Sequence, residues 1–134
     1  MKLSFRVALL ALLMNSGIAY SAPEIGETAN IRGLLLSAIN SRDGKAEAWL
    51  VGPMAQKLKN DTKAPTYTKV KASVTTVQVI RPGCKRLRIV FSMPTHRMMT
   101  VKGTREPFSM FYELNLCQDG QPPQVSPVGL GEDK

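Results

Sequence analysis

Two runs of alternating apolar residues constrain this chain more than any other feature of its sequence. The runs Cys84 to Met93 and Phe108 to Cys117 carry an apolar side chain at every second position, from Leu87 onward in the first run and throughout the second. That period belongs to a β-strand with one buried face. The apolar positions are Leu87, Ile89, Phe91 and Met93 in the first run and Phe108, Met110, Tyr112, Leu114 and Leu116 in the second. The sequence therefore predicts two strands with a common buried face.

One antiparallel register satisfies both runs, the one in which the numbers of partner residues sum to 201. It matches the two apolar faces to each other and sets Arg88 opposite Glu113 on the polar side. A shift by one residue would turn the apolar face of one strand against the polar face of the other. The same register places Cys84 opposite Cys117, which requires a non-hydrogen-bonded position, where the two backbones approach most closely.

The first 21 residues have the pattern of a secretory signal peptide. Lys2 and Arg6 accompany an uncharged apolar run from Val7 to Met14. At about eight residues, this run is much shorter than the roughly 20 residues that a membrane-spanning helix needs. The small residues Ala19 and Ser21 predict cleavage after Ser21, so we expect a periplasmic protein.

Both cysteines of the chain lie in the predicted mature part. An even number of cysteines in an exported chain favours a disulfide over free thiols. Two cysteines 33 positions apart and the single His96 do not have the ligand spacing of a tetrahedral metal site. We therefore predict a Cys84–Cys117 disulfide and no cofactor or metal. Residues 22–117 form the predicted domain, and the Pro- and Gly-rich residues 118–134 form a flexible tail.

Weaker patterns complete the fold prediction. They indicate a helix within Ile25 to Ile39 capped by Thr28 or Asn30, a strand from Ala46 to Val51, a helix from Met54 to Lys59, and a Val- and Thr-rich strand from Lys69 to Val79 with a bulge near Thr75 and Thr76. The predicted fold class is α+β: an N-terminal helix, a short strand and helix, and then a three-stranded antiparallel β-meander with a cross-strand disulfide.

Positive charge is concentrated in the middle of the chain. Lys57 to Arg105 contains twelve basic residues and one acid, Asp61, within a chain of formal net charge +8. Clustering of one sign indicates an anionic partner, either a polyanion or an acidic protein surface. The connection Pro94 to Pro107 is long for a hairpin and is a candidate functional loop. The candidate docking or anion-binding residues are Arg86, Arg88, Arg97, Lys102 and Arg105.

The chain carries no recognisable catalytic motif. It has no Gly-x-Ser-x-Gly nucleophile elbow, no Gly-rich phosphate loop and no metal-binding signature, so we expect no enzymatic activity. Proteins that bind single-stranded nucleic acid place aromatic platforms between basic residues, yet Lys57 to Arg105 contains only Tyr67 and Phe91. Trp49 is expected in the core. A nucleic acid is therefore a less favoured partner than a protein of the cell envelope.

Three groups of residues resemble small exported proteins encoded in conjugative-transfer (type IV secretion) gene clusters. They are Gly52-Pro53, then Pro82-Gly83-Cys84-Lys85-Arg86-Leu87, then Asn115-Leu116-Cys117-Gln118-Asp119-Gly120 with Pro122-Pro123. The resemblance spans roughly residues 44–123, and its motifs are turns and disulfide elements. It implies a periplasmic accessory protein of conjugation that acts through protein contacts, and it carries over no binding or catalytic residues.

Two alternatives from other classes remain open at this point. The protein could be a secreted inhibitor or immunity protein that inserts its long loop into the active site of an envelope-targeting enzyme. It could instead bind a polyanion, DNA or lipopolysaccharide, directly. The sequence does not determine the oligomeric state.

Overall fold

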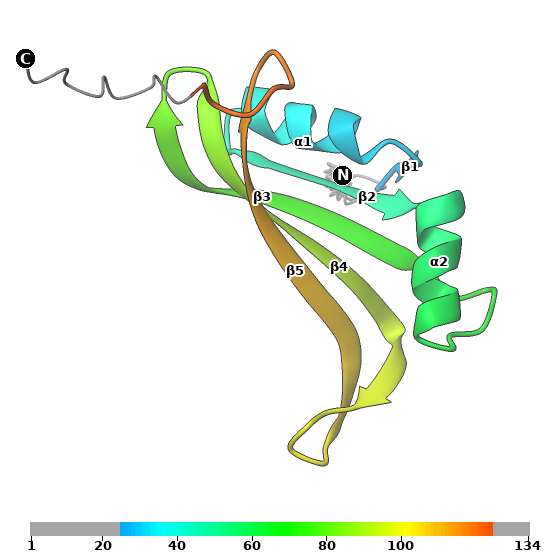
Figure 1. Cartoon of the computed structure of the whole chain (residues 1–134). Helices are drawn as coiled ribbons and strands as arrows, with labels where there is room; N and C mark the ends of the chain where they lie inside the picture. Colours follow the sequence, from blue (N-terminus) through cyan, green and yellow to red (C-terminus); the bar gives the residue numbers. More distant parts are fainter. Residues whose placement is uncertain (1–24, 125–134) are drawn as a thin grey trace, which may run out of the picture.

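The computed structural model describes residues 25–124 as an α+β fold (Figure 1). The predicted signal peptide and residues 125–134 lie outside the described residues. The elements are β1 (Glu27–Thr28), α1 (Ile31–Asn40), β2 (Lys45–Leu50), α2 (Pro53–Asp61), β3 (Val70–Arg81), β4 (Cys84–Met99) and β5 (Arg105–Cys117). Both helices lie on the same side of a single sheet, as Figure 1 shows.

The sheet has five strands in the order β1-β2-β3-β4-β5. The predicted three-stranded meander exists as β3-β4-β5, but it is only part of the sheet. β2 pairs antiparallel with β3, and β1 adds a parallel strand beside β2, with α1 as the crossover between them. β1 escapes sequence reasoning because its two residues are too few to show a period.

Asn30 is the residue that separates β1 from α1. Its side chain accepts a hydrogen bond from the backbone N–H of Gly33 at 3.0 Å. An N-cap of this kind starts the helix at Ile31, so of the two predicted caps, Thr28 and Asn30, the structure confirms Asn30. At the other end, Lys85 Nζ donates to the carbonyl of Ile39 at 2.8 Å. A cation there satisfies one of the last carbonyls of the helix and interacts favourably with the helix dipole.

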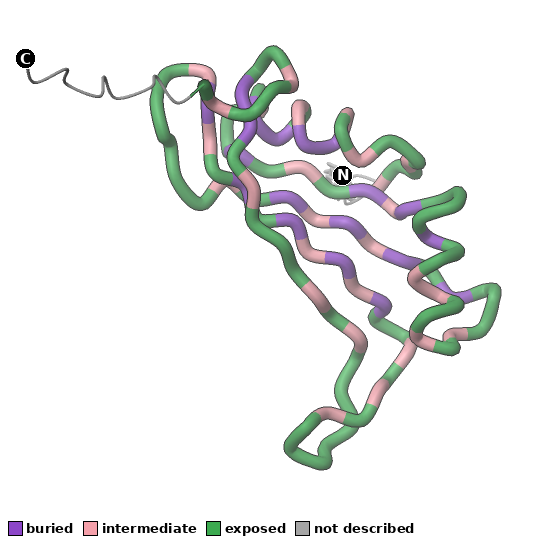
Figure 2. Tube along the Cα trace, viewed as in Figure 1, coloured by how far each residue is buried: buried purple, intermediate pink, exposed green. Residues whose placement is uncertain are grey.

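The predicted register of β4 and β5 is confirmed. Cys84 pairs with Cys117, Arg88 with Glu113 and every residue between, up to the pair of Met93 with Phe108. The Cys84–Cys117 disulfide is formed. Leu87, at the centre of β4, is 0% exposed. Figure 2 shows buried residues alternating with less buried ones along the inner strands.

The prediction that residues 94–107 form a long loop is wrong. β4 continues to Met99 and β5 begins at Arg105, so only residues 100–104 connect them. Beyond Met93 the register resumes at the pair Arg97 with Pro107. Three residues of β4, 94–96, therefore have no partner on β5 and form a bulge at Pro94, a position where proline is tolerated in a sheet. The bulge interrupts the alternation that would otherwise have revealed the strand.

Residues 118–124, the first part of the predicted tail, follow β5 as a turn. Gln118 N–H donates to the carbonyl of Gly83 at 2.8 Å, and Cys117 N–H donates to the carbonyl of Gln121 at 2.9 Å. Arg32 on α1 and Arg81 on β3 donate to the carbonyls of Gly120 and Gln124. These bonds attach the turn to the disulfide end of the sheet.

Candidate functional site

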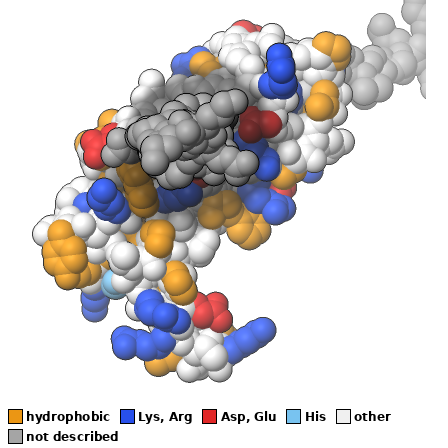
Figure 3. Space-filling view, turned by 180° about the vertical axis from the view of Figure 1, so that it is seen from behind, with side chains coloured by type: hydrophobic (Ala, Val, Ile, Leu, Met, Phe, Trp, Pro, Cys, Tyr) orange, Lys and Arg blue, Asp and Glu red, His pale blue; other side chains and the backbone are white. Residues whose placement is uncertain are grey.

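The side of the sheet away from the helices carries most of the charged residues of the strands. We call this side the open face. The strand registers assign to it Lys45, Glu47, Trp49, Lys71, Ser73, Arg86, Arg88, Val90, Ser92, Phe111 and Glu113. Lys69, which precedes β3, belongs to it through its contact with the Trp49 ring. Figure 3 views the molecule from this side and shows Lys and Arg side chains beside exposed hydrophobic ones.

Arg86 and Arg88 share one carboxylate on the open face. Arg88 donates from Nε at 2.9 Å and from Nη2 at 2.6 Å to Glu113 Oε1, while Arg86 Nε lies 3.9 Å from Oε2. Arg88 also lies over the ring of Phe111, at 5.1 Å from its centroid. The predicted Arg88–Glu113 pair is confirmed, and it halves the positive charge that these two arginines present.

Arg97, Lys102 and Arg105 lie at the far end of the same hairpin. We call residues 97–106 the hairpin tip. Arg97 Nη2 donates to the carbonyl of Arg105 at 3.0 Å, and the backbone of the turn closes by a bond from Thr100 N–H to the carbonyl of Thr104 at 2.7 Å. The only acid in the tip is Glu106, which accepts a bond from the Thr104 hydroxyl at 3.2 Å. The tip therefore carries three cations and one anion.

The five candidate docking residues form two clusters instead of one. Glu113 lies seven positions after Glu106 on β5, which corresponds to about 24 Å along an extended strand. Arg86 and Arg88 follow Cys84 of the disulfide by two and four residues on β4. The tip, at the other end of the hairpin, extends beyond α2 (Figure 1). A partner that contacts both clusters has to follow the length of the hairpin.

The expectation of a core position for Trp49 is wrong. Trp49 is half-buried on the open face, and Lys69 Nζ lies 5.3 Å from the centroid of its ring. Beside it, Lys71 forms an ion pair with Glu47 at 2.8 Å. The alternation in β2 contains the signal that could have shown this, because Ala48 and Leu50 are the buried residues and Trp49 lies between them.

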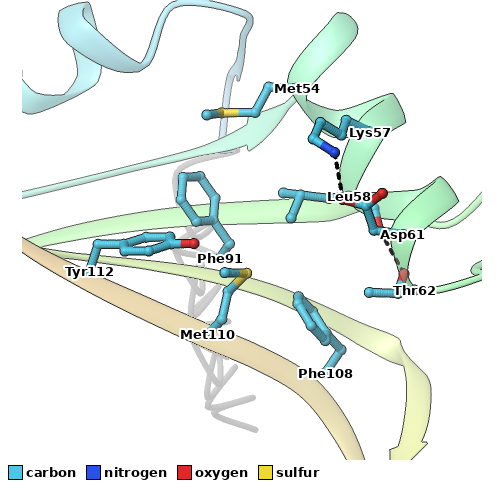
Figure 4. A pocket seen from close by; sticks show the side chains of 9 residues that line it. All are labelled: Met54, Lys57, Leu58, Asp61, Thr62, Phe91, Phe108, Met110 and Tyr112. Carbon is cyan, nitrogen blue, oxygen red and sulfur yellow. Dashed lines mark hydrogen bonds and ion pairs between the residues drawn. The ribbon is translucent and has the colours of Figure 1, made fainter.

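An apolar cavity of about 340 Å³ opens on the helix side of the sheet, between α2 and β5. It is lined by Met54, Lys57, Leu58, Asp61, Thr62, Phe91, Phe108, Met110 and Tyr112 (Figure 4). Phe91 forms its floor and is 4% exposed, whereas Tyr112 at its margin is 54% exposed. The ion pair of Lys57 and Asp61 at 2.9 Å is its charged part. Sequence reasoning did not find this cavity, because it depends on where α2 crosses the sheet.

Metal-binding and membrane-spanning features are not found within residues 25–124. His96 Nε2 lies 3.1 Å from the carbonyl oxygen of Thr62, and no three His, Cys, Asp or Glu side chains in this range are grouped as a metal site would need. None of the helices in the same range is long and apolar enough to cross a membrane.

No protein-family model matches the chain, and no curated protein or solved structure does so either. The structure itself defines the class: a small disulfide-bonded α+β protein with a mixed five-stranded sheet. Helices cover one side of this sheet, the other side is basic, and one hairpin extends beyond the helices.

Proposed function

We propose that this protein is a non-enzymatic periplasmic accessory protein of a conjugative DNA-transfer (type IV secretion) apparatus. It acts by protein–protein contact, and its hairpin tip binds an acidic surface of an envelope protein. The observation that carries the proposal is the exposure of Arg97, Lys102 and Arg105 on a hairpin that projects past the rest of the fold. The envelope location is supported by the signal-peptide pattern and by the disulfide, which is typical of exported proteins.

The tip is suited to be a recognition element because its backbone is held in place. The Arg97 to Arg105 and Thr100 to Thr104 hydrogen bonds fix the turn, so little backbone entropy is lost on binding. Arginine is enriched at protein interfaces and pairs with carboxylates in a planar, bidentate geometry. Electrostatic complementarity of this kind mainly raises the association rate and the specificity.

The experiment is affinity capture from detergent-solubilised cell envelopes with three forms of the protein. The tip variant carries Arg97→Glu, Lys102→Glu and Arg105→Glu. The matched control carries Arg42→Glu, Lys45→Glu and Lys63→Glu, which changes the net charge by the same amount on exposed residues elsewhere. We expect the tip variant to lose the captured partner and the control to keep it. Capture of the same partner by the tip variant would refute the docking role of the tip.

A second function, binding of single-stranded nucleic acid, is supported by the open face. The sequence argument against it was the lack of aromatic residues among the basic ones, but the sheet brings in Trp49 and Phe111 from outside that segment. Both lie beside cations, Lys69 and Arg88 respectively, which is the combination that sequence-tolerant single-strand binders use.

Trp49 is the only tryptophan of the chain and reports on this second function directly. Stacking of a base on its ring would quench its fluorescence when a mixed-sequence DNA oligonucleotide is added at low salt. The apparent affinity would then fall steeply as salt is raised. An unchanged Trp49 signal at saturating oligonucleotide would exclude the open face as a nucleic-acid platform.

A further inference from the structure

β5 forms an edge of the sheet that is 13 residues long. Among the described residues it pairs only with β4, so its other side presents unpaired backbone groups. Natural proteins normally shorten, bend or cover such an edge, because it is a template for another strand. An uncovered edge of this length therefore suggests that β5 pairs with a further strand.

The register identifies the backbone groups that point outward from this edge. The Cα atoms of Cys84 and Cys117 are 3.9 Å apart, and Cys117 N–H donates to Gln121 instead of β4. Both observations mark a non-hydrogen-bonded pair. Because such pairs alternate along an antiparallel ladder, Ser109, Phe111, Glu113 and Asn115 direct their N–H and C=O groups away from β4.

The outward stretch is bounded at both ends. On one side Pro107 has no N–H to donate, and on the other the Cys117 N–H already belongs to the turn that follows β5. The outward-facing groups available for pairing are therefore those of four residues at alternate positions, from Ser109 to Asn115. The centre of this stretch is Tyr112, with two of these residues on each side.

We propose that this edge pairs with the same edge of a second copy of the chain, in an antiparallel arrangement with a two-fold axis at Tyr112. Ser109 then pairs with Asn115 of the second copy, and Phe111 pairs with Glu113 of the second copy. This register matches all four outward-facing residues of both copies. A shift of two residues either way leaves one residue without an outward-facing partner or pairs it with Pro107, which cannot donate.

The side chains on both faces are compatible with this register. On the helix side, Tyr112 meets its own counterpart and Met110 faces Leu114 of the second copy, so the apolar wall of the cavity continues across the axis. The exposed part of Tyr112, 54% of its surface, is thereby covered. On the open face, Glu113 comes opposite Phe111 of the second copy, over whose ring Arg88 lies at 5.1 Å. The charges across the axis are therefore complementary.

The dimer does not depend on the proposed function, because the hairpin tip lies outside the paired stretch. It is tested by sedimentation velocity over a range of protein concentrations at moderate salt, with two substitutions at one position. Phe111→Pro removes an outward N–H that is not bonded to β4, whereas Phe111→Thr removes the ring and keeps the N–H. Phe111→Pro deletes two hydrogen bonds per dimer, so we expect its dissociation constant to rise about thirty-fold or more. Phe111→Thr should remain dimeric.

Amide hydrogen exchange of the unmodified protein provides a test that needs no variant. The amides of Ser109, Phe111, Glu113 and Asn115 should become protected as the protein concentration rises. Those of Met110, Tyr112 and Leu114 bond to β4 and should be protected at every concentration. A protein that stays monomeric, or a dimer that tolerates Phe111→Pro as well as Phe111→Thr, would overturn the proposal.

Discussion

Removal of the Cys84–Cys117 disulfide should lower the free energy of unfolding by about 3.7 kcal/mol at 25 °C. The bond joins residues with a sequence separation of 33, and the loop-closure entropy of an unfolded chain with that cross-link gives this value. The two cysteines are 5% and 8% exposed, so the loss of two packed sulfur atoms acts in the same direction. For a domain of this size the total is a large fraction of the stability.

The native ladder is expected to survive the change. The pairs from Arg86 with Asn115 to Met93 with Phe108 hold the register without the sulfur bridge. The destabilisation therefore arises mainly in the unfolded chain, which gains conformations when the loop is opened. A double variant, Cys84→Ala with Cys117→Ala, tests this without leaving a single reactive thiol.

Urea unfolding, followed by the fluorescence of Trp49, measures the effect. With a slope of about 1.5 kcal/mol per molar urea, the midpoint should fall by roughly 2.5 M. The unmodified protein in excess reductant should show the same shift, because its loop is equally open. A loss below about 1 kcal/mol in both samples would refute the loop-entropy argument.

Three further changes test other parts of the structure. Gly44→Ala should lower the free energy of unfolding by about 2 kcal/mol or more in thermal unfolding. The reason is that Gly44 has a φ of 68° and an added Cβ would lie 2.8 Å from Thr76 Oγ1. Gly103 has a φ of 83° but open space around it, so Gly103→Ala should cost only about 1 kcal/mol, and equal losses for the two variants would contradict this reasoning. A double-mutant cycle of Arg88→Gln and Glu113→Gln should give a coupling of about 0.5–1 kcal/mol that falls in high salt, as expected for a half-exposed pair. Zero coupling at low salt would be inconsistent with the observed ion pair. Hydrogen bonds from the Lys45 N–H and the Ser41 hydroxyl lower the pKa of Asp43, so its stabilisation should be present above the usual pKa of 3.8 and be lost as the pH falls through the lowered value. NMR titration of the Asp43 carboxyl checks this, and a pKa at or above 3.8 would show that these bonds do not favour the carboxylate.

Period-two patterns were sufficient to predict the β4–β5 pairing because three requirements coincide in one register. Burial of Leu87, pairing of Arg88 with Glu113 and contact of Cys84 with Cys117 cannot all be met in any other alignment. The class, α+β, follows from these strands and from the helical spacing before them. A register can be predicted in this way only where both strands have one buried and one exposed face.

The sequence pattern does not predict how the remaining strands assemble into the sheet. β1 consists of Glu27 and Thr28, and its parallel pairing with β2 is visible only once α1 has crossed the sheet. The open face has the same origin, because its aromatic and basic residues come from four different strands. Trp49 was assigned to the core from its residue type, although its position between Ala48 and Leu50 places it on the other side.

The bulge at 94–96 has the largest consequence for the candidate site. In an uninterrupted strand Arg97, four residues after the buried Met93, would lie on the helix side. The bulge contains an odd number of residues, and β5 has no matching insertion. Arg97 is therefore opposite Pro107, one residue beyond the helix-side Phe108, and so belongs to the same side as Arg105. An extension of the alternation past Pro94 would have put the two arginines on opposite faces, and only the three-residue bulge brings Arg97 to the backbone of Arg105 in a single basic tip.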